Sequence, residues 1–114
     1  VNVFGSAEDV KRLVKDTGCS FCVDFAHLKA RSNGQMSYKE MVSEFKEFKE
    51  WHCHFSGIVY GDKGEKNHIR TPEKELKELL KELKALKDKC NITIINESPD
   101  PLKDSVTSIK ILKN

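Results

Sequence analysis

Five side chains that can bind metal ions or transfer protons fall at the ends of predicted strands or in the loops after them: Asp24, His27, His54, His68 and Glu97. In parallel α/β sheets the carboxyl ends of the strands meet at one edge, where such proteins build their sites. Two carboxylates and three imidazoles that converge there suit zinc, iron or manganese. The sequence therefore predicts a divalent metal site.

Each of these residues, taken singly, also has an ordinary structural explanation. A carboxylate after a strand can cap the helix that follows it, and a lone histidine such as His68 can be an exposed loop residue. The set favours metal ligation, because three of the four histidines occur at strand exits or in their loops. The other, His52, falls near the end of a predicted helix, so we expect a structural or exposed role for it.

Length and composition fit one globular domain. The chain has 114 residues, of which 38% are hydrophobic and 33% charged, and its net charge of +2 neither demands nor excludes nucleic acid. It has no signal-peptide pattern and no apolar run of the roughly 18 residues that a membrane span needs. We therefore expect a cytoplasmic protein whose four cysteines, Cys19-Ser-Phe-Cys22 included, are ordinary reduced thiols.

Helical and strand patterns alternate along the chain. Four helices are predicted to start at Ser6, Ser37, Thr71-Pro72 and Asp100-Pro101, with Leu102, Val106 and Ile109 of the last one facing inward. The predicted strands are residues 21–24, 53–56 (extended by 58–60) and 91–95, with loops at 25–34 and 61–70. Residues 1–5 are interpreted as the end of an earlier element.

This alternation predicts an α/β fold with parallel strands. Three strands are too few for a doubly wound sheet, so we interpret residues 1–114 as one partial domain, the C-terminal part of an eight-stranded (β/α) TIM barrel. The N-terminal strands would be missing from this chain. Its open strand edges are expected to pair with that missing part or with a second copy of the chain.

Four segments together resemble the endonuclease IV family of zinc-dependent apurinic/apyrimidinic endonucleases: Asp24-Phe-Ala-His27, His54-Phe-Ser-Gly57, the loop with His68, and Asn96-Glu97-Ser98-Pro99. The resemblance covers essentially the whole chain in order and spacing. It implies barrel strands 6–8, up to three zinc ions with manganese as a substitute, and hydrolysis of the phosphodiester 5′ to abasic sites in duplex DNA.

The resemblance also implies a role for each matching residue. Asp24, His54 and Glu97 would hold a pair of ions and act in catalysis through them, whereas His27 and His68 would bind the third ion. The family pattern has an aspartate two residues before the loop histidine, where this sequence has Lys66. Glu65, one residue further back, is a candidate replacement.

Three further ligands of the family's site come from earlier strands, so we expect this fragment to be inactive alone. Lys29, Arg31, Lys63 and Arg70 lie in loops that are expected to face the site, where they are candidates for phosphate contacts.

Two other functions fit part of the pattern. Sugar isomerases and epimerases that resemble xylose isomerase have carboxylates and histidines at the same strand ends, often with manganese or magnesium. They have no need of a second loop histidine, so His68 favours the endonuclease. A non-catalytic metal-binding relative is favoured by Lys66 in place of the aspartate.

Overall fold

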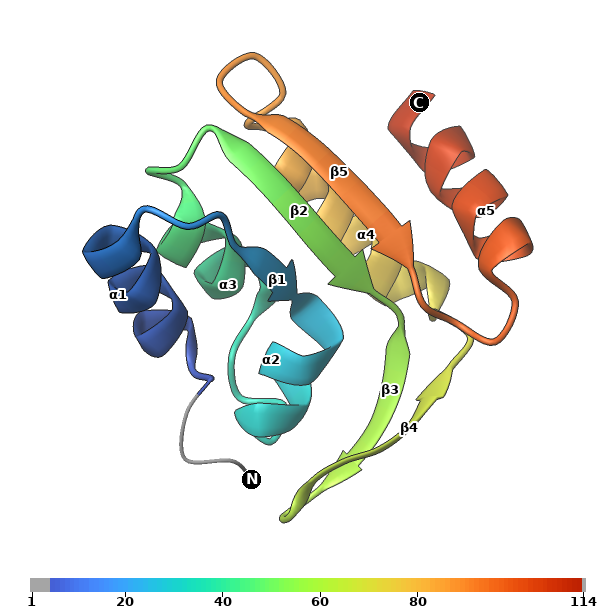
Figure 1. Ribbon diagram of the computed structural model, residues 1–114. Helices are drawn as coiled ribbons and strands as arrows, with labels where there is room; N and C mark the ends of the chain where they lie inside the picture. The colour runs from blue at the N-terminus through green and yellow to red at the C-terminus, as the bar shows by residue number, and fades with distance from the viewer. Residues whose placement is uncertain (1–4, 114) are drawn as a thin grey trace.

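A computed structural model gives the structure of residues 5–113 (Figure 1). The elements are α1 (Ala7–Thr17), β1 (Cys22–Asp24), α2 (Phe25–Arg31), α3 (Tyr38–Phe45), β2 (Glu50–Phe55), β3 (Gly57–Gly61), β4 (Gly64–Ile69), α4 (Glu73–Lys84), β5 (Asn91–Asn96) and α5 (Pro101–Lys113). Residues 1–4, which make up most of the expected N-terminal element, lie outside the part of the chain that the structure describes. No helix within residues 5–113 combines the length and apolar character of a membrane span.

Three parallel strands form the main sheet, in the order β1–β2–β5, which is also their order in the chain. The register pairs Asp24 with His54 on β1 and β2, and His54 with Ile95 on β2 and β5. The α/β class and the parallel strands that the sequence predicts are confirmed. The register places the ends of the three strands beside one another.

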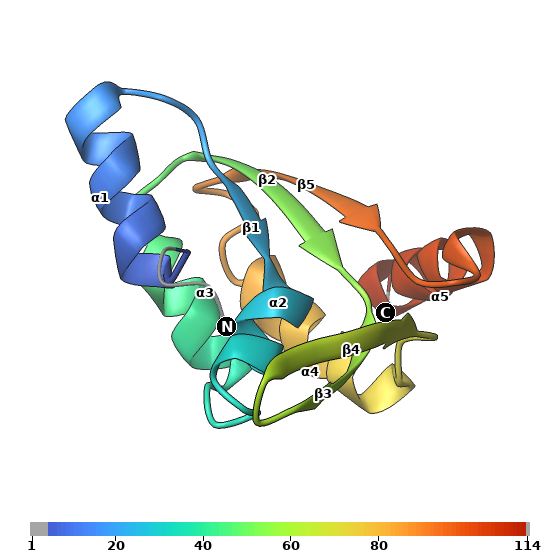
Figure 2. The ribbon, with the colours of Figure 1, turned by 60° about the horizontal axis from the view of Figure 1, so that its bottom comes forward.

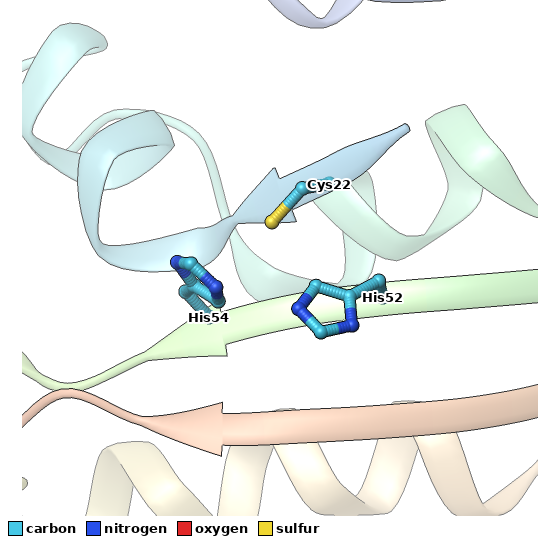
Figure 3. A group of neighbouring side chains, drawn as sticks. All are labelled: Cys22, His52 and His54. Carbon is cyan, nitrogen blue, oxygen red and sulfur yellow. The ribbon is translucent and has the colours of Figure 1, made fainter. Parts of the chain in front are cut away.

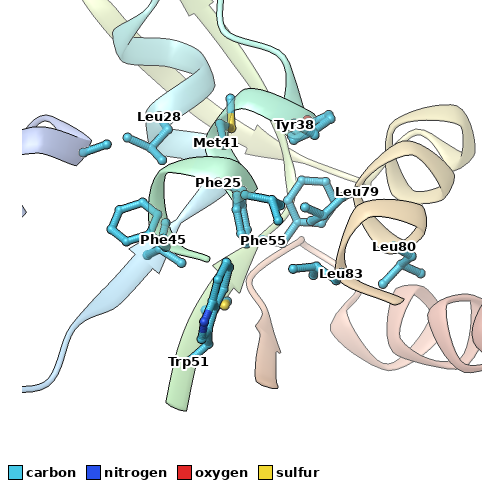
Figure 4. Close-up of a cluster of buried hydrophobic side chains, with 14 of the residues drawn as sticks. Phe25, Leu28, Tyr38, Met41, Phe45, Trp51, Phe55, Leu79, Leu80 and Leu83 are labelled. Atoms are coloured by element: carbon cyan, nitrogen blue, oxygen red, sulfur yellow. The ribbon is translucent and has the colours of Figure 1, made fainter. Parts of the chain in front are cut away.

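The core lies on one face of this sheet. Val23, Trp51, Cys53 and Phe55 alternate along β1 and β2 and are buried against helices, as Figure 4 shows for the two aromatic residues. Figure 2 shows α3 and α4 on this side of the sheet. Since successive strand residues point to opposite faces, the residues between the core positions lie on the other, open face. That face therefore carries Cys22, Asp24, His52 and His54.

Several predicted helix ends follow their capping signals, and one does not. Ser6 accepts a hydrogen bond from the backbone N–H of Asp9 in a capping box, and Gly18 ends α1 in the left-handed conformation with φ 71°. Ser37 caps α3 by accepting the backbone N–H of Glu40. Thr71 does not cap α4, contrary to the prediction, because its hydroxyl accepts the N–H of Gly57 and the helix begins at Glu73.

Both predicted loops contain regular structure, so these predictions are wrong. Residues 25–31 form α2, because Asp24 caps a segment with four buried apolar residues. Residues 57–69 form the antiparallel hairpin β3–β4, rather than an extension of β2 followed by a loop. Gly64 at its tip has φ 102°, a conformation that favours glycine.

The last helix is rotated relative to the sequence-based expectation. Leu102, Val106 and Ile109 are 74%, 42% and 52% exposed, so they do not face inward in this structure. Asp104 is buried instead, and it bonds to Arg70 and to the backbone N–H of Thr71. This polar attachment sets which side of α5 faces the rest of the protein.

Candidate metal centre

The first candidate ligand group combines two carboxylates and one histidine. Ligand atoms of Asp24, His54 and Glu97 lie within 4.8 Å of one another. Asp24 and His54 are register partners on the open face, and the Glu97 N–H continues the β2–β5 ladder by donating to the Phe55 carbonyl. This places a Glu97 carboxylate oxygen 3.2 Å from His54 Nδ1. The strand ends therefore bring these three predicted ligands together.

Asp24 also positions His27. One carboxylate oxygen of Asp24 accepts the backbone N–H of His27, 3.0 Å away, as the N-cap of α2. The other oxygen lies 3.6 Å from His27 Nδ1, so the ring is held with Nε2 pointing away from Asp24. His27 Nε2 lies 2.7 Å from a carboxylate oxygen of Glu65 on the hairpin.

The second candidate ligand group is completed by the hairpin. His27, Glu65 and His68 have ligand atoms within 4.8 Å of one another, and the two imidazole rings are 5.6 Å apart between centroids. The hydroxyl of Ser56, a buried residue, lies 2.6 Å from His68 Nδ1. A partner on one ring nitrogen fixes the orientation of a histidine ligand, and this one directs Nε2 toward Glu65.

A β-bulge explains why Glu65 can replace the expected aspartate. The register passes from Val59 opposite Asn67 to Tyr60 opposite Glu65, so Lys66 is the extra residue of β4. In a regular strand, residues two apart share a face and residues three apart do not. One extra residue restores the shared face. The bulge therefore lets Glu65 and His68, three residues apart, reach one point as an Asp-x-His pair would.

The two groups border a common pocket. A cavity of about 440 Å³ beside β1 and α2 is lined in part by Asp24, His27 and Glu65. Two of the cations that were expected to contact phosphate here are paired elsewhere. Lys29 pairs with Glu75, and Arg70 pairs with Asp104. Lys63, by contrast, lines the cavity.

Two side chains near the site, Cys22 and His52, were not predicted to be metal ligands. His52 lies on β2, not near a helix end as expected, because α3 stops at Phe45. The alternation Trp51-His52-Cys53-His54-Phe55 is the signal that places both histidines on one face. Cys22 lies on the same face, and burial, together with the charges of Asp24 and Glu97, raises the pKa of its thiol.

Comparison with known proteins gives one informative match. The sequence is 35% identical over 118 residues to an uncharacterized protein of Methanocaldococcus jannaschii. The match covers 94% of this chain but 43% of that protein, so the chain spans less than half of its relative's length. No family model matches the sequence, and no solved structure matches it.

Proposed function

We propose that this chain is the C-terminal part of a (β/α) TIM barrel that acts as a zinc-dependent endonuclease of the endonuclease IV type. The complete protein would hydrolyse the phosphodiester 5′ to an abasic site in duplex DNA. The observation that carries the proposal is the presence of two adjacent groups of carboxylates and imidazoles at the strand ends. One group is Asp24, His54 and Glu97, and the other is His27, Glu65 and His68.

The donor chemistry of both groups fits divalent metal ions. Each group offers imidazole nitrogen together with carboxylate oxygen, a combination that suits zinc or manganese. The second group matters most, because a sugar isomerase of the barrel class needs no additional histidine-containing site. Glu65 on the bulged strand supplies the carboxylate that Lys66 cannot, so the departure from the family pattern is compensated.

Several features support the barrel interpretation. The strands follow one another in chain order, the core helices cover one face of the sheet, and the other face is open. The apolar stripe Leu102, Val106 and Ile109 is a surface that additional barrel elements would cover. Since 94% of this chain corresponds to 43% of its relative, that relative has roughly 250 residues, the usual length of a complete barrel.

In the proposed mechanism the protein's own residues hold and orient the ions. Zinc, when bound, supplies an activated water near neutral pH and positive charge for the attacking and leaving oxygens. Asp24, His54 and Glu97 hold the ions at the strand ends, and Asp24 at the same time fixes the start of α2. Ser56 orients His68, and Lys63 at the cavity provides a cation for the DNA backbone.

Substitution of Glu65 tests the role assigned to the bulged strand. We expect Glu65→Gln in the full-length polypeptide to bind one zinc ion fewer per molecule and to nick abasic duplex DNA more slowly, because an amide is a much poorer zinc ligand than a carboxylate. Lys66→Ala is the matched control and should keep both properties. Metal analysis of dialysed protein and a nicking assay give the two results.

A Glu65→Gln variant that retains the wild-type zinc content would show that Glu65 is not a ligand. A Lys66→Ala variant that loses an ion while Glu65→Gln keeps it would contradict the compensation by the bulge.

A further inference from the structure

A third group of ligand atoms lies on the open face of the sheet; it shares His54 with the first group and differs from both groups above in containing a thiol. Cys22 on β1 and His52 and His54 on β2 place a sulfur atom and two imidazole nitrogens within 4.8 Å of one another (Figure 3). Cys22 and His52 are register partners on adjacent strands. The rings of His52 and His54 are 5.4 Å apart between centroids.

The backbone, rather than flexible loops, sets this arrangement. Residues two apart on a strand share a face, so His52 and His54 must project to the same side of β2. The register of the parallel pair then places Cys22 beside them. The intervening Cys53 is fully buried on the opposite face, and Cys19 precedes β1 and is exposed. Cys22 is therefore the cysteine that the sheet directs toward the two histidines.

We propose that Cys22, His52 and His54 form a metal site of their own, which binds Zn²⁺ or a similar borderline-soft ion through one thiolate and two imidazoles. One cysteine and two or more histidines are a donor set that zinc accepts in tetrahedral coordination, and three protein ligands leave one position open. Binding displaces the thiol proton to solvent, as for any metal-bound cysteine.

Sulfur distinguishes this site from the carboxylate-containing groups. Thiolate selects softer ions, whereas carboxylate and imidazole also accept manganese and magnesium. His54 belongs to this group and to the group with Asp24 and Glu97. The complete protein would therefore carry a thiolate-containing position directly beside the site proposed for the nuclease. Neither Cys22 nor His52 has a role in that nuclease, so the proposal does not depend on it.

Cobalt substitution tests the site through the sulfur ligand. We expect Co²⁺ added to the metal-free full-length polypeptide to produce a near-ultraviolet thiolate-to-cobalt charge-transfer band, which Zn²⁺ then removes. Cys22→Ser should abolish the band. Cys19→Ser, which removes the other thiol of the same short segment, should leave it unchanged. His52→Ala should weaken cobalt binding by at least about tenfold, since even loss of a ligand's outer partner has such an effect.

Cys22 and His52 are exposed, so their substitution should leave the fold intact, and far-ultraviolet circular dichroism checks this directly. Absence of the charge-transfer band from folded wild-type protein, or a band that survives Cys22→Ser, would overturn the proposal. A band in a protein without nuclease activity would reject only the proposed function. Nicking activity without the band would reject only the thiolate site.

Discussion

His54→Ala should reduce nicking of abasic duplex DNA by about a thousandfold or more, because metal ions supply several kcal/mol of charge stabilisation and each 1.36 kcal/mol is a factor of ten in rate. Among residues 5–113, His54 is the residue shared by two of the three ligand groups. Its ring also lies directly beside Glu97. Loss of this single imidazole therefore removes a ligand from the centre of the site.

The measurement is the single-turnover nicking rate of the zinc-loaded full-length polypeptide, together with its zinc content. Glu50→Ala is the matched control, because Glu50 lies on the same face and strand but at the opposite end, where it accepts a hydrogen bond from Asn91. The control should nick at the wild-type rate. A His54→Ala variant with undiminished nicking and zinc content would reject the assignment of His54 as a ligand.

Asp104→Ala should lower the free energy of unfolding by about 2–4 kcal/mol, because hydrogen bonds to a charged group contribute about 1.5–3 kcal/mol and their partners become unpaired. Asp104 is 3% exposed. It accepts hydrogen bonds from Arg70 Nε at 3.1 Å, Arg70 Nη2 at 2.7 Å and the Thr71 backbone N–H at 3.0 Å. The Arg70 side chain is 53% exposed, so solvent screening keeps the cost below that of a fully buried ion pair.

Urea denaturation measures this effect. Asp16→Ala is the matched control, because it also removes an aspartate that pairs with an arginine, but on the surface. That substitution should change the stability by less than about 0.5 kcal/mol. Equal effects of the two substitutions would show that Asp104 does not anchor α5.

The stabilisation by Asp104 should also depend on pH. Burial alone would raise the pKa of Asp104, but hydrogen bonds from Arg70, Thr71 and Ser98 hold it below the ordinary value of 3.8. A pKa that is lower in the folded state adds stability that is fully present above the unfolded value and is lost as pH falls through the folded one. The difference in stability between wild type and Asp104→Asn should therefore narrow below about pH 4.

Local signals in the sequence were sufficient for the strands that position Asp24, His54 and Glu97, but not for the helix and hairpin that position the second group. Ser6 and Ser37 start helices because their hydroxyls satisfy backbone N–H groups, and the apolar segments between helices form parallel strands as predicted. The structure then brings the predicted ligands Asp24, His54 and Glu97 together through strand register. His27 and His68 meet in the second group, with Glu65 between them.

The remaining features depend on contacts between distant residues. None of residues 64–69 is fully buried and most are polar, so no apolar alternation signals β4. The bulge at Lys66 is visible only once β4 pairs with β3. The rotation of α5 is set by the Asp104–Arg70 pair, which links residues 34 positions apart. Hydrophobic spacing alone favoured the opposite face of that helix.

Nicking of a duplex with one tetrahydrofuran abasic analogue tests the central proposal most directly, because this analogue cannot undergo β-elimination and reports hydrolysis alone. The full-length polypeptide would be stripped of metal and then loaded with zinc. We predict a single zinc-dependent cut on the 5′ side of the analogue, with a 3′-hydroxyl end, and no cut in intact duplex. A folded, zinc-loaded protein that leaves the analogue uncut would contradict the endonuclease proposal, and manganese-dependent sugar isomerisation would be the next activity to measure.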